Sequence, residues 1–345
     1  MLENISFLAT CVGAYGDSGL GTGGFFLWHR GEGVVIDNLD STGLVFTKGL
    51  CYRFIRALQT LVIYDASGVR STVRLSEAKD VHDIYVTEKE VIVVSTGTNE
   101  VHWYDWRGEI IRKWSPGGNG DAWHLNCLYG VDTEIYISAF GKFDNHRDWN
   151  GNCRDTGFVM KMHTEELIIE GLSGPHNPRK IHNRWLICDS HKRGIRIIEN
   201  GENNFVNLGG FTRGIAVTSK GWLVGVSADR KSALENPTGK IKLVESERCE
   251  IMEEVSVPFP EIYDIVEITP EFGSAIISDP SKYLISLSDK EKANLKNQVN
   301  LGLEEIYRQN AIIDHLKKKN AYLAKKKSKD SLFKKVFHRI KSRLG

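Results

Sequence analysis

The sequence of 345 residues predicts an all-β fold, a β-propeller of six blades, followed by an α-helical tail. Two observations support this prediction. From residue 1 to about residue 285, short runs of β-branched and aromatic residues alternate with Gly, Asn and Asp, which is typical of many short strands. A polar anchor residue also recurs along this region, and repeats of blade length indicate a propeller. We expect three parts: a propeller (1–287), a helical coiled-coil segment (288–324) and a basic amphipathic helix (325–345).

Each repeat begins with its anchor, and its second apolar strand ends in Ser 13 or 14 residues later. Successive anchors are 37 to 52 residues apart, which fits one four-stranded blade with its loops. Ser41 lies 41 residues before the first anchor and begins an earlier blade. A seventh blade is an open alternative, because both termini carry a similar strand pattern. The anchor and Ser pairs are His82 and Ser95, His124 and Ser138, His176 and Ser190, Arg213 and Ser227, and Asp264 and Ser278.

The termini are expected to complete the ring. Strands around Phe7–Cys11 and Phe25–His29 would pair with the C-terminal strands, which leaves no exposed sheet edge. No helical periodicity is evident before Ser288. Strands within the blades are predicted at Val91–Val94, Val101–Tyr104, Ile135–Ile137, Leu186–Cys188, Ile195–Ile198 and Ala275–Ile277.

The composition and charge of the chain limit its class and location. With 41% apolar and 26% charged residues, it is not a disordered, collagenous or disulfide-scaffold protein. The net charge of +1 results from two opposite charges that nearly cancel: residues 316–345 carry +11, and the rest of the chain carries −10. The apolar run at Ile5–Tyr15 is short and follows an acid, so we expect no signal peptide. The six cysteines form no C-x-x-C pair, so we expect them to be reduced thiols. Reduced thiols favour a cytoplasmic location.

The anchors are the first candidate site, because the first strand of each blade lines the channel of a propeller. We predict that His82, His124, His176, Arg213 and Asp264 are catalytic. The three imidazoles could bind a divalent transition metal of unknown identity or contact the substrate directly. Arg213 is suited to grip a carboxylate or phosphate.

The neighbours of the anchors are polar as well. Asp83, Asn126 and Asn177 could orient the imidazole rings, and we also predict that Asn126, Asn177 and Arg179 bind substrate. A structural alternative stands beside this prediction. In many propellers a His near the start of a blade donates to a Ser on the next strand and only holds the blade together. The change of anchor to Arg and Asp in later blades argues against a purely structural role.

The insertion Phe143–Thr156 is a second candidate site. It is long and polar, and such loops on a rigid scaffold often carry function. Within it, Arg147 and Trp149 are predicted substrate-binding residues, since a tryptophan can stack on a sugar face. A solvated loop without function is the alternative.

Several of these motifs together resemble a bacterial family known only as a domain of unknown function, for which a β-propeller is predicted. The similarity runs from about Asp83 to Ser227, and it implies the fold without implying an activity. The sequence departs from the family pattern at Asn177, where Ser is expected. The motifs are His82-Asp83, His124-Leu125-Asn126, Gly174-Pro175-His176-Asn177-Pro178-Arg179, Asp189-Ser190 and Gly210-Phe211-Thr212-Arg213-Gly214.

The helical segment after Ser288 shows a heptad pattern that predicts self-association through residues 295–323. An Asn at one a position would fix the register of a parallel coiled coil. A single helix folded back on the propeller is the alternative, because Gly302 and Gln309 weaken the seam. The a positions are Val299, Ile306, Ile313 and Asn320, and the d positions are Leu295, Gly302, Gln309, Leu316 and Leu323.

The last helix combines an apolar face with basic flanks, which is typical of helices that lie on an anionic membrane. Each basic residue near such a surface contributes about 1 kcal/mol. A nucleic-acid tail and a docking helix for an acidic partner are the alternatives, and the acidic body disfavours nucleic acid. The predicted membrane-binding residues are Phe333, Lys334, Lys335, Phe337, Arg339, Ile340, Lys341 and Arg343.

Two functional hypotheses follow. The first is a cytoplasmic enzyme on the inner face of the membrane, acting at the channel on an anionic, carbohydrate-linked substrate in surface-polysaccharide metabolism. Its partners would then include a glycan or polysaccharide-assembly enzymes. The second is a non-catalytic scaffold that binds a glycan or protein and is oligomerised by its helical tail.

Overall fold

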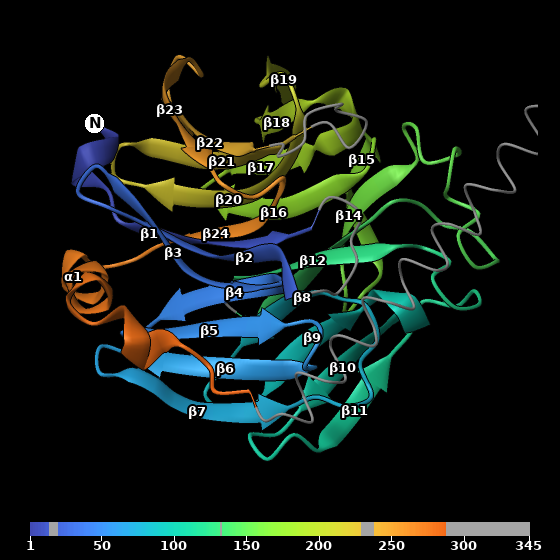
Figure 1. The fold of residues 1–345 in the computed structure, drawn as a ribbon. Helices are drawn as coiled ribbons and strands as arrows, with labels where there is room; N and C mark the ends of the chain where they lie inside the picture. Colours follow the sequence, from blue (N-terminus) through green and yellow to red (C-terminus); the bar gives the residue numbers. More distant parts are fainter. Residues whose placement is uncertain (14–19, 132, 229–237, 288–345) are drawn as a thin grey trace, which may run out of the picture. The chain divides into compact units, whose positions relative to one another are not determined.

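The computed structural model of the protein describes residues 1–13, 20–131, 133–228 and 238–287. Six four-stranded sheets surround a central channel, which confirms the six-bladed propeller and excludes a seventh blade (Figure 1). The predicted coiled coil (288–324) and basic helix (325–345) lie outside the described residues. Within the described part of the chain, no helix is long and apolar enough to cross a membrane.

The strands follow one another around the ring in chain order. The first blade contains β4 (Ser41–Thr47), β5 (Leu50–Ile55), β6 (Thr60–Asp65) and β7 (Gly68–Arg74), and the second contains β8 (Val81–Val86), β9 (Val91–Ser95), β10 (Glu100–Tyr104) and β11 (Ile110–Trp114). The third contains β12 (Leu125–Val131), β13 (Glu134–Ala139), β14 (Gly157–Lys161) and β15 (Glu166–Leu172), and the fourth contains β16 (Pro175–Ile181), β17 (Arg184–Asp189), β18 (Gly194–Glu199) and β19 (Glu202–Asn207). The fifth contains β20 (Phe211–Thr218), β21 (Gly221–Ser227), β22 (Gly239–Val244) and β23 (Ile251–Val257), and the sixth contains β24 (Glu261–Glu267), β1 (Phe7–Val12), β2 (Leu20–His29) and β3 (Glu32–Leu39).

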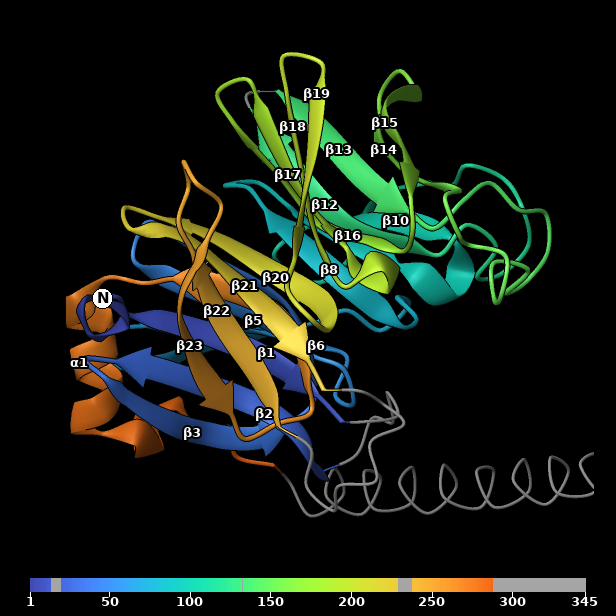
Figure 2. The ribbon, with the colours of Figure 1, turned by 90° about the horizontal axis from the view of Figure 1, so that it is seen from above.

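The innermost strands form a closed circle. β4, β8, β12, β16, β20 and β24 each contact the next innermost strand, and β24 contacts β4 again. Figure 2 shows four of these strands, β8, β12, β16 and β20. The strand register shifts beside the anchors, for example between Val81 and Asp83 in β8 and between Arg213 and Ile215 in β20. Such bulges re-aim side chains. His82 and Arg213 lie beside these shifts, near the start of their inner strands.

The sixth blade joins both ends of the propeller. The C-terminal strand β24 pairs antiparallel with β1, from Phe7 opposite Glu267 to Val12 opposite Glu261. This pairing confirms the predicted closure of the ring. It makes the N-terminal strands part of the same sheet as the last strand of the propeller.

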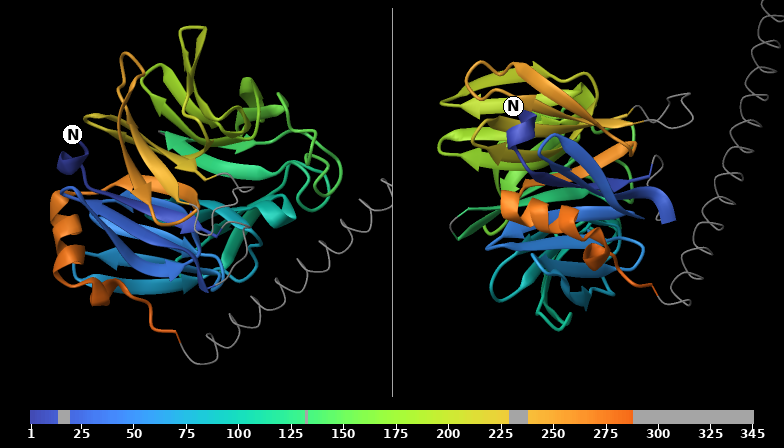
Figure 3. Two further views of the ribbon diagram at one scale, coloured as in Figure 1. Left: turned by 45° about the horizontal axis from the view of Figure 1, so that its top comes forward. Right: turned by 60° about the vertical axis from the view of Figure 1, so that its left-hand side comes forward.

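The segment after β24 corrects one prediction. Ala275–Ile277 is not a strand, because it lies in the helix α1 (Pro270–Ser278), and a short 3₁₀ helix, Pro280–Tyr283, follows (Figure 3). Thr269 caps α1 by accepting from the Phe272 amide, and Pro270 starts it. Because β1 already occupies the place beside β24, the expected pairing of Asp264 with Ser278 does not occur. The terminal chain packs on the outside of the ring instead.

The apolar core lies mainly between the sheets. Phe272 and Tyr283 of the terminal segment pack into a cluster with Leu44 and Tyr64 of the first blade and Leu27 of the sixth blade, so they cover the junction between these two blades. All six cysteines are free thiols, and five of them are buried.

Candidate functional site

One end of the channel opens into a cavity of 230 Å³ to which all six blades contribute. Its wall combines charged and aromatic side chains. Three of the five predicted catalytic residues line it together with both predicted residues of the insertion. The polar and aromatic lining residues include Arg56, Asp80, His82, His124, Phe140, Arg147, Trp149, His191, Phe211, Arg213, Glu261 and Tyr263.

His124 is held in one orientation by Asp121. Its Nδ1 donates to the Asp121 carboxylate at 2.9 Å, and both side chains are buried. His124 also has a φ of +52°, an uncommon value for a non-glycine residue that is often found at functional sites. Because Nδ1 carries the proton, the Nε2 of the neutral ring has a free lone pair.

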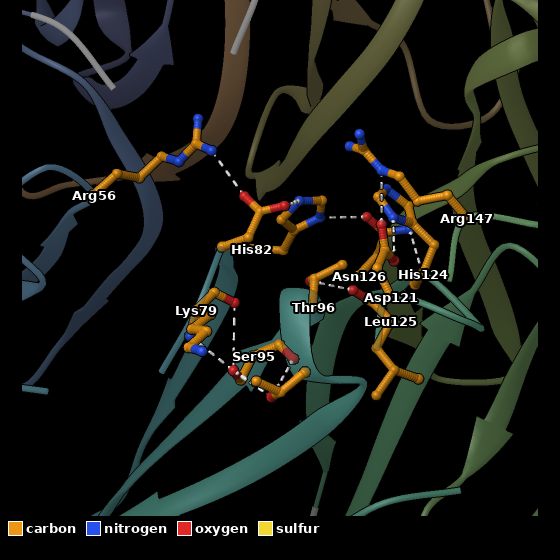
Figure 4. A network of polar contacts seen from close by, with 12 residues as sticks. Arg56, Lys79, His82, Ser95, Thr96, Asp121, His124, Leu125, Asn126 and Arg147 are labelled. Carbon is orange, nitrogen blue, oxygen red and sulfur yellow. Dashed lines mark hydrogen bonds and ion pairs between the residues drawn. The ribbon is translucent and has the colours of Figure 1, made fainter. Parts of the chain in front are cut away.

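His82 is held in a similar way by Asn126. The Asn126 amide donates through Nδ2 to the carbonyl of His124 at 3.0 Å, so its Oδ1 accepts from Nδ1 of His82 at 2.8 Å. Nε2 of His82 lies 3.5 Å from Oδ2 of Asp80, whose Oδ1 accepts from Arg56 at 2.7 Å. Figure 4 shows the resulting chain of polar contacts, from Arg56 to the insertion.

The two imidazoles face one another edge to face, with ring centroids 4.9 Å apart. Burial lowers the pKa of His124 to about 4, although the hydrogen bond to Asp121 opposes this shift. His124 is therefore neutral at pH 7. Burial by itself would raise the pKa of Asp80, but His82 and Arg56 hold it below its usual range. Asp80 is therefore a carboxylate next to His82.

Arg213 also lines the cavity and is paired with a carboxylate. Its Nη1 donates to Oε1 of Glu261 at 3.1 Å, and its guanidinium covers the ring of Tyr263 at 4.1 Å. Both members of the ion pair are buried. The structure therefore places Arg213 in the site but already bound to an acid.

The insertion Phe143–Thr156 folds against this cavity, so the two predicted sites form one. Trp149 donates from its indole to the backbone carbonyl of Asp121 at 3.0 Å, and its ring lies 4.1 Å from that of His124. Nε of Arg147 lies 3.3 Å from the Asp121 carboxylate. Asp121 therefore connects the insertion to the histidine pair.

His176 stands apart from this pair. Its Nδ1 donates to Ser190 at 2.7 Å, while the Ser190 hydroxyl donates onward to the Thr212 carbonyl. The structural alternative from the sequence, a His-to-Ser bond within the blade, thus holds for this anchor. Phe140 packs against both His176 and His124, and Nε2 of His176 is buried without a partner in the described structure.

A separate buried cluster contains the remaining predicted residues. Asp264 accepts from the Asn177 side chain at 3.1 Å and lies 3.6 Å from the Arg179 guanidinium. Oδ1 of Asn177 accepts from the Gly214 amide at 2.7 Å, and Asp83 accepts from the Leu128 amide at 2.8 Å. The Asn177–Gly214 and Asp83–Leu128 bonds connect neighbouring blades, whereas the contacts of Asp264 connect the sixth blade with the fourth. Catalytic or binding roles for Asp264, Asn177 and Arg179 remain predictions.

Comparison with known sequences identifies the family. The family model described as "Domain of unknown function (DUF4915)" matches residues 56–268, which is more than half of the chain. The chain belongs to the DUF4915 family. The matched range contains every cavity-lining residue given above. No curated protein sequence matches the chain.

Solved structures with similar folds share little sequence with this DUF4915 chain. A nidogen–laminin complex gives a TM-score of 0.54 at 10% identity, covering 77% of this chain and 99% of the other. A protein of unknown function from Bacteroides caccae gives 0.51 at 10% identity, with coverages of 77% and 99%. The calcium-binding protein regucalcin from Agrobacterium tumefaciens gives 0.49 at 10% identity, with coverages of 70% and 86%. The first two similarities support the propeller fold alone.

This DUF4915 propeller offers only some of the ligands that a transition metal needs. His82 and His124 each have the outer hydrogen-bond partner that metal-ligating imidazoles have, although Nε2 of His82 also lies 3.5 Å from the Asp80 carboxylate. Catalytic zinc sites, by comparison, have three protein ligands. Among the described residues, no group of three or more His, Cys, Asp or Glu side chains is arranged to hold a metal ion. The predicted three-histidine metal site remains a prediction.

The acidic partners of the histidines, Asp80 and Asp121, were not among the predicted site residues. Asp80 lies two residues before His82, and Asp121 lies three residues before His124. An acid shortly before the anchor could therefore have indicated these partners. Arg56, Glu261 and Tyr263 also line the cavity. No local motif marks these three, because they reach the cavity from two other blades.

Proposed function

We propose that this propeller is an enzyme that acts on a carbohydrate-linked substrate in the cavity, with proton transfer by the His82–His124 pair. The observation that carries the proposal is the pair itself. Two buried imidazoles, each fixed through Nδ1, face a cavity and lie 4.9 Å apart. Pairs of titratable groups in different environments are typical of acid–base catalysis.

The two histidines would have different roles. His82 would exchange a proton with the substrate, because Asn126 fixes its Nδ1 and its Nε2 lies beside the Asp80 carboxylate. His124 would remain neutral and accept a hydrogen bond from a substrate hydroxyl through Nε2. Asp121 and Asn126 would act as positioning residues, since each fixes the tautomer of one ring.

The size and lining of the cavity support a sugar unit. Pockets for drug-sized ligands have volumes of about 300–1,000 Å³, and this cavity of 230 Å³ suits a smaller ligand. Trp149 offers an aromatic surface, and the Arg and carboxylate side chains offer donors and acceptors for hydroxyl groups. This combination favours a single sugar ring over a longer chain.

The location of the enzyme in the cell is part of the proposal. The basic helix at residues 325–345 would hold the propeller at the cytoplasmic face of an anionic membrane, and residues 295–323 would make it an oligomer. Surface polysaccharides are assembled at such a membrane. Glycan substrates and polysaccharide-assembly enzymes would therefore be its partners.

The test is a screen of purified protein against methyl glycosides, uronic acids and sugar phosphates, with binding and conversion followed by NMR. We expect at least one sugar to bind and to be converted. His82→Asn should abolish conversion while binding persists, whereas Trp149→Ala should weaken binding at least tenfold. Binding without any conversion would favour the scaffold alternative. Conversion that survives His82→Asn would contradict the proposed role.

Metal content is measured on the same preparations. Stoichiometric transition metal that disappears in His82→Ala and His124→Ala would add a metal to the mechanism. Metal that persists in both variants would place it elsewhere in the protein.

A further inference from the structure

The charges of the cavity bear on the kind of sugar it would accept, and this inference rests on the proposed function. The sequence predicts an anionic ligand gripped by Arg213. The structure instead pairs each of the three cavity arginines with an acid: Arg56 with Asp80, Arg147 with Asp121, and Arg213 with Glu261.

Within these pairs each positive charge is matched by a negative one. The carboxylates of Asp80, Asp121 and Glu261 balance the three guanidinium groups of Arg56, Arg147 and Arg213. The buried Asp40 adds a further favourable interaction for Arg56. A carboxylate or phosphate entering the cavity would therefore meet the lining acids Asp80 and Glu261 as well as the three arginines. Charges separated by a few ångströms interact strongly in such a partly desolvated site.

The same pairs are well suited to neutral hydroxyl groups. Each joins a donor and an acceptor at one point: Arg56 Nη2 with Asp80 Oδ1 at 2.7 Å, and Arg213 Nη1 with Glu261 Oε1 at 3.1 Å. Two adjacent hydroxyls of a sugar ring present one donor and one acceptor at a similar separation. An arginine–carboxylate pair can therefore bond to both hydroxyls without becoming unpaired.

We infer that the cavity selects a neutral sugar ring over its charged counterparts, and that the Arg213–Glu261 and Arg56–Asp80 pairs determine this selectivity. Glu261 is a specificity-determining residue because it neutralises the arginine that would otherwise attract an anion. Asp80 has the same effect on Arg56. The ligand class is a neutral, polyhydroxylated ring of monosaccharide size.

The inference is tested with methyl α-D-glucopyranoside, the corresponding methyl glucuronide and the methyl glucosaminide, which share one ring and differ in charge. Dissociation constants are measured on the full chain by NMR titration. We expect the neutral glycoside to bind at least tenfold more tightly than either charged analogue. Glu261→Gln, which keeps the shape and removes the charge, should shift the ratio of glucuronide to glucoside affinity at least tenfold toward the glucuronide.

Two controls keep the outcomes distinct. Glu199→Gln removes the acid from an arginine pair on β18, outside the cavity, and should leave the ratio unchanged. Asp80→Asn should repeat the shift if Glu261→Gln does not fold. Tighter glucuronide binding to the wild type, or an unchanged ratio in a folded Glu261→Gln variant, would overturn the inference while the carbohydrate site stands. Absence of binding by all three glycosides would overturn the proposed function and this inference together.

Discussion

Asp121 makes several of the polar contacts beside the cavity. Its carboxylate accepts from Nδ1 of His124 and from Arg147, its backbone carbonyl accepts from the indole of Trp149, and its amide donates to His146. One buried acid therefore orients a histidine and secures the insertion. The sequence predicted His124, Arg147 and Trp149 but not the acid that joins them, because its three-dimensional partners are 25 to 28 residues away along the insertion.

The role of Asp121 predicts the state of His124. In the wild type, side-chain ¹⁵N NMR should show His124 neutral at pH 7, protonated on Nδ1, with a pKa near 4. In Asp121→Asn, the Nδ1–H tautomer should lose its preference because the carboxylate acceptor is gone. Asp144→Asn, in the same insertion, is the control and should leave the spectrum unchanged. A His124 that titrates near its usual pKa of 6.5 would contradict this assignment.

The buried acids of the channel predict a second pH dependence. Burial and the neighbouring Asp264 raise the pKa of Asp83, and burial raises the pKa of Asp264. The folded state then keeps protons that the unfolded chain has already lost. The free energy of unfolding should therefore fall as pH rises above about 4, until the folded-state pKa values are passed.

Urea denaturation between pH 7.5 and 9 tests this, because His124 is neutral in the folded and largely neutral in the unfolded chain over this range. We expect the wild type to lose on the order of 1 kcal/mol. Asp83→Asn should show a smaller slope, whatever its absolute stability. Equal slopes in the two proteins would show that Asp83 and Asp264 do not cause the pH dependence of the free energy of unfolding.

At the scale of the elements, the blades were predictable and the terminal segment was not. Runs such as Val91–Val94 and Leu186–Cys188 are buried strands within β9 and β17, as their β-branched and apolar residues predict. Ala275–Ile277 has the same composition but forms part of α1. Tertiary structure, not local sequence, explains why this segment is a helix. β1 from the N-terminus already pairs with β24, where a following strand would have to pair.

Close approach between neighbouring blades makes a further prediction. Gly214 in β20 has a φ of +73°, and a Cβ there would lie 2.9 Å from Ile265 Cγ1 and 3.1 Å from its amide nitrogen. Gly201 has a similar φ of +83° but no atom within 4 Å. Gly201→Ala should therefore cost about 1 kcal/mol from backbone strain alone, and Gly214→Ala about 2–4 kcal/mol from strain and overpacking. Urea denaturation measures both, and equal losses would contradict this account of blade packing.

At the scale of the whole molecule, the near-zero net charge divides into an acidic body and a basic tail. The propeller belongs to the body, which carries −10 up to residue 315, and residues 316–345 carry +11. The described residues contain no helix that could span a membrane. The proposed attachment uses the basic amphipathic helix that the sequence predicts at residues 325–345.

Flotation with liposomes containing anionic lipid tests this attachment. The full chain should float with the liposomes and dissociate at high salt, because screening weakens the contribution of the basic residues. A chain lacking residues 331–345 should remain at the bottom of the gradient. Equal flotation of the two proteins would contradict the proposed anchor.

The central claim is that the cavity between His82, His124 and Trp149 binds and converts a sugar. The most direct measurement is NMR of protein carrying ¹³C- and ¹⁵N-labelled histidine during titration with methyl α-D-glucopyranoside. We expect the ring signals of His82 and His124 to shift together and to saturate. The ring signals of His102, which is buried within the second blade, should not shift. Saturable binding that leaves both His82 and His124 unchanged would contradict it.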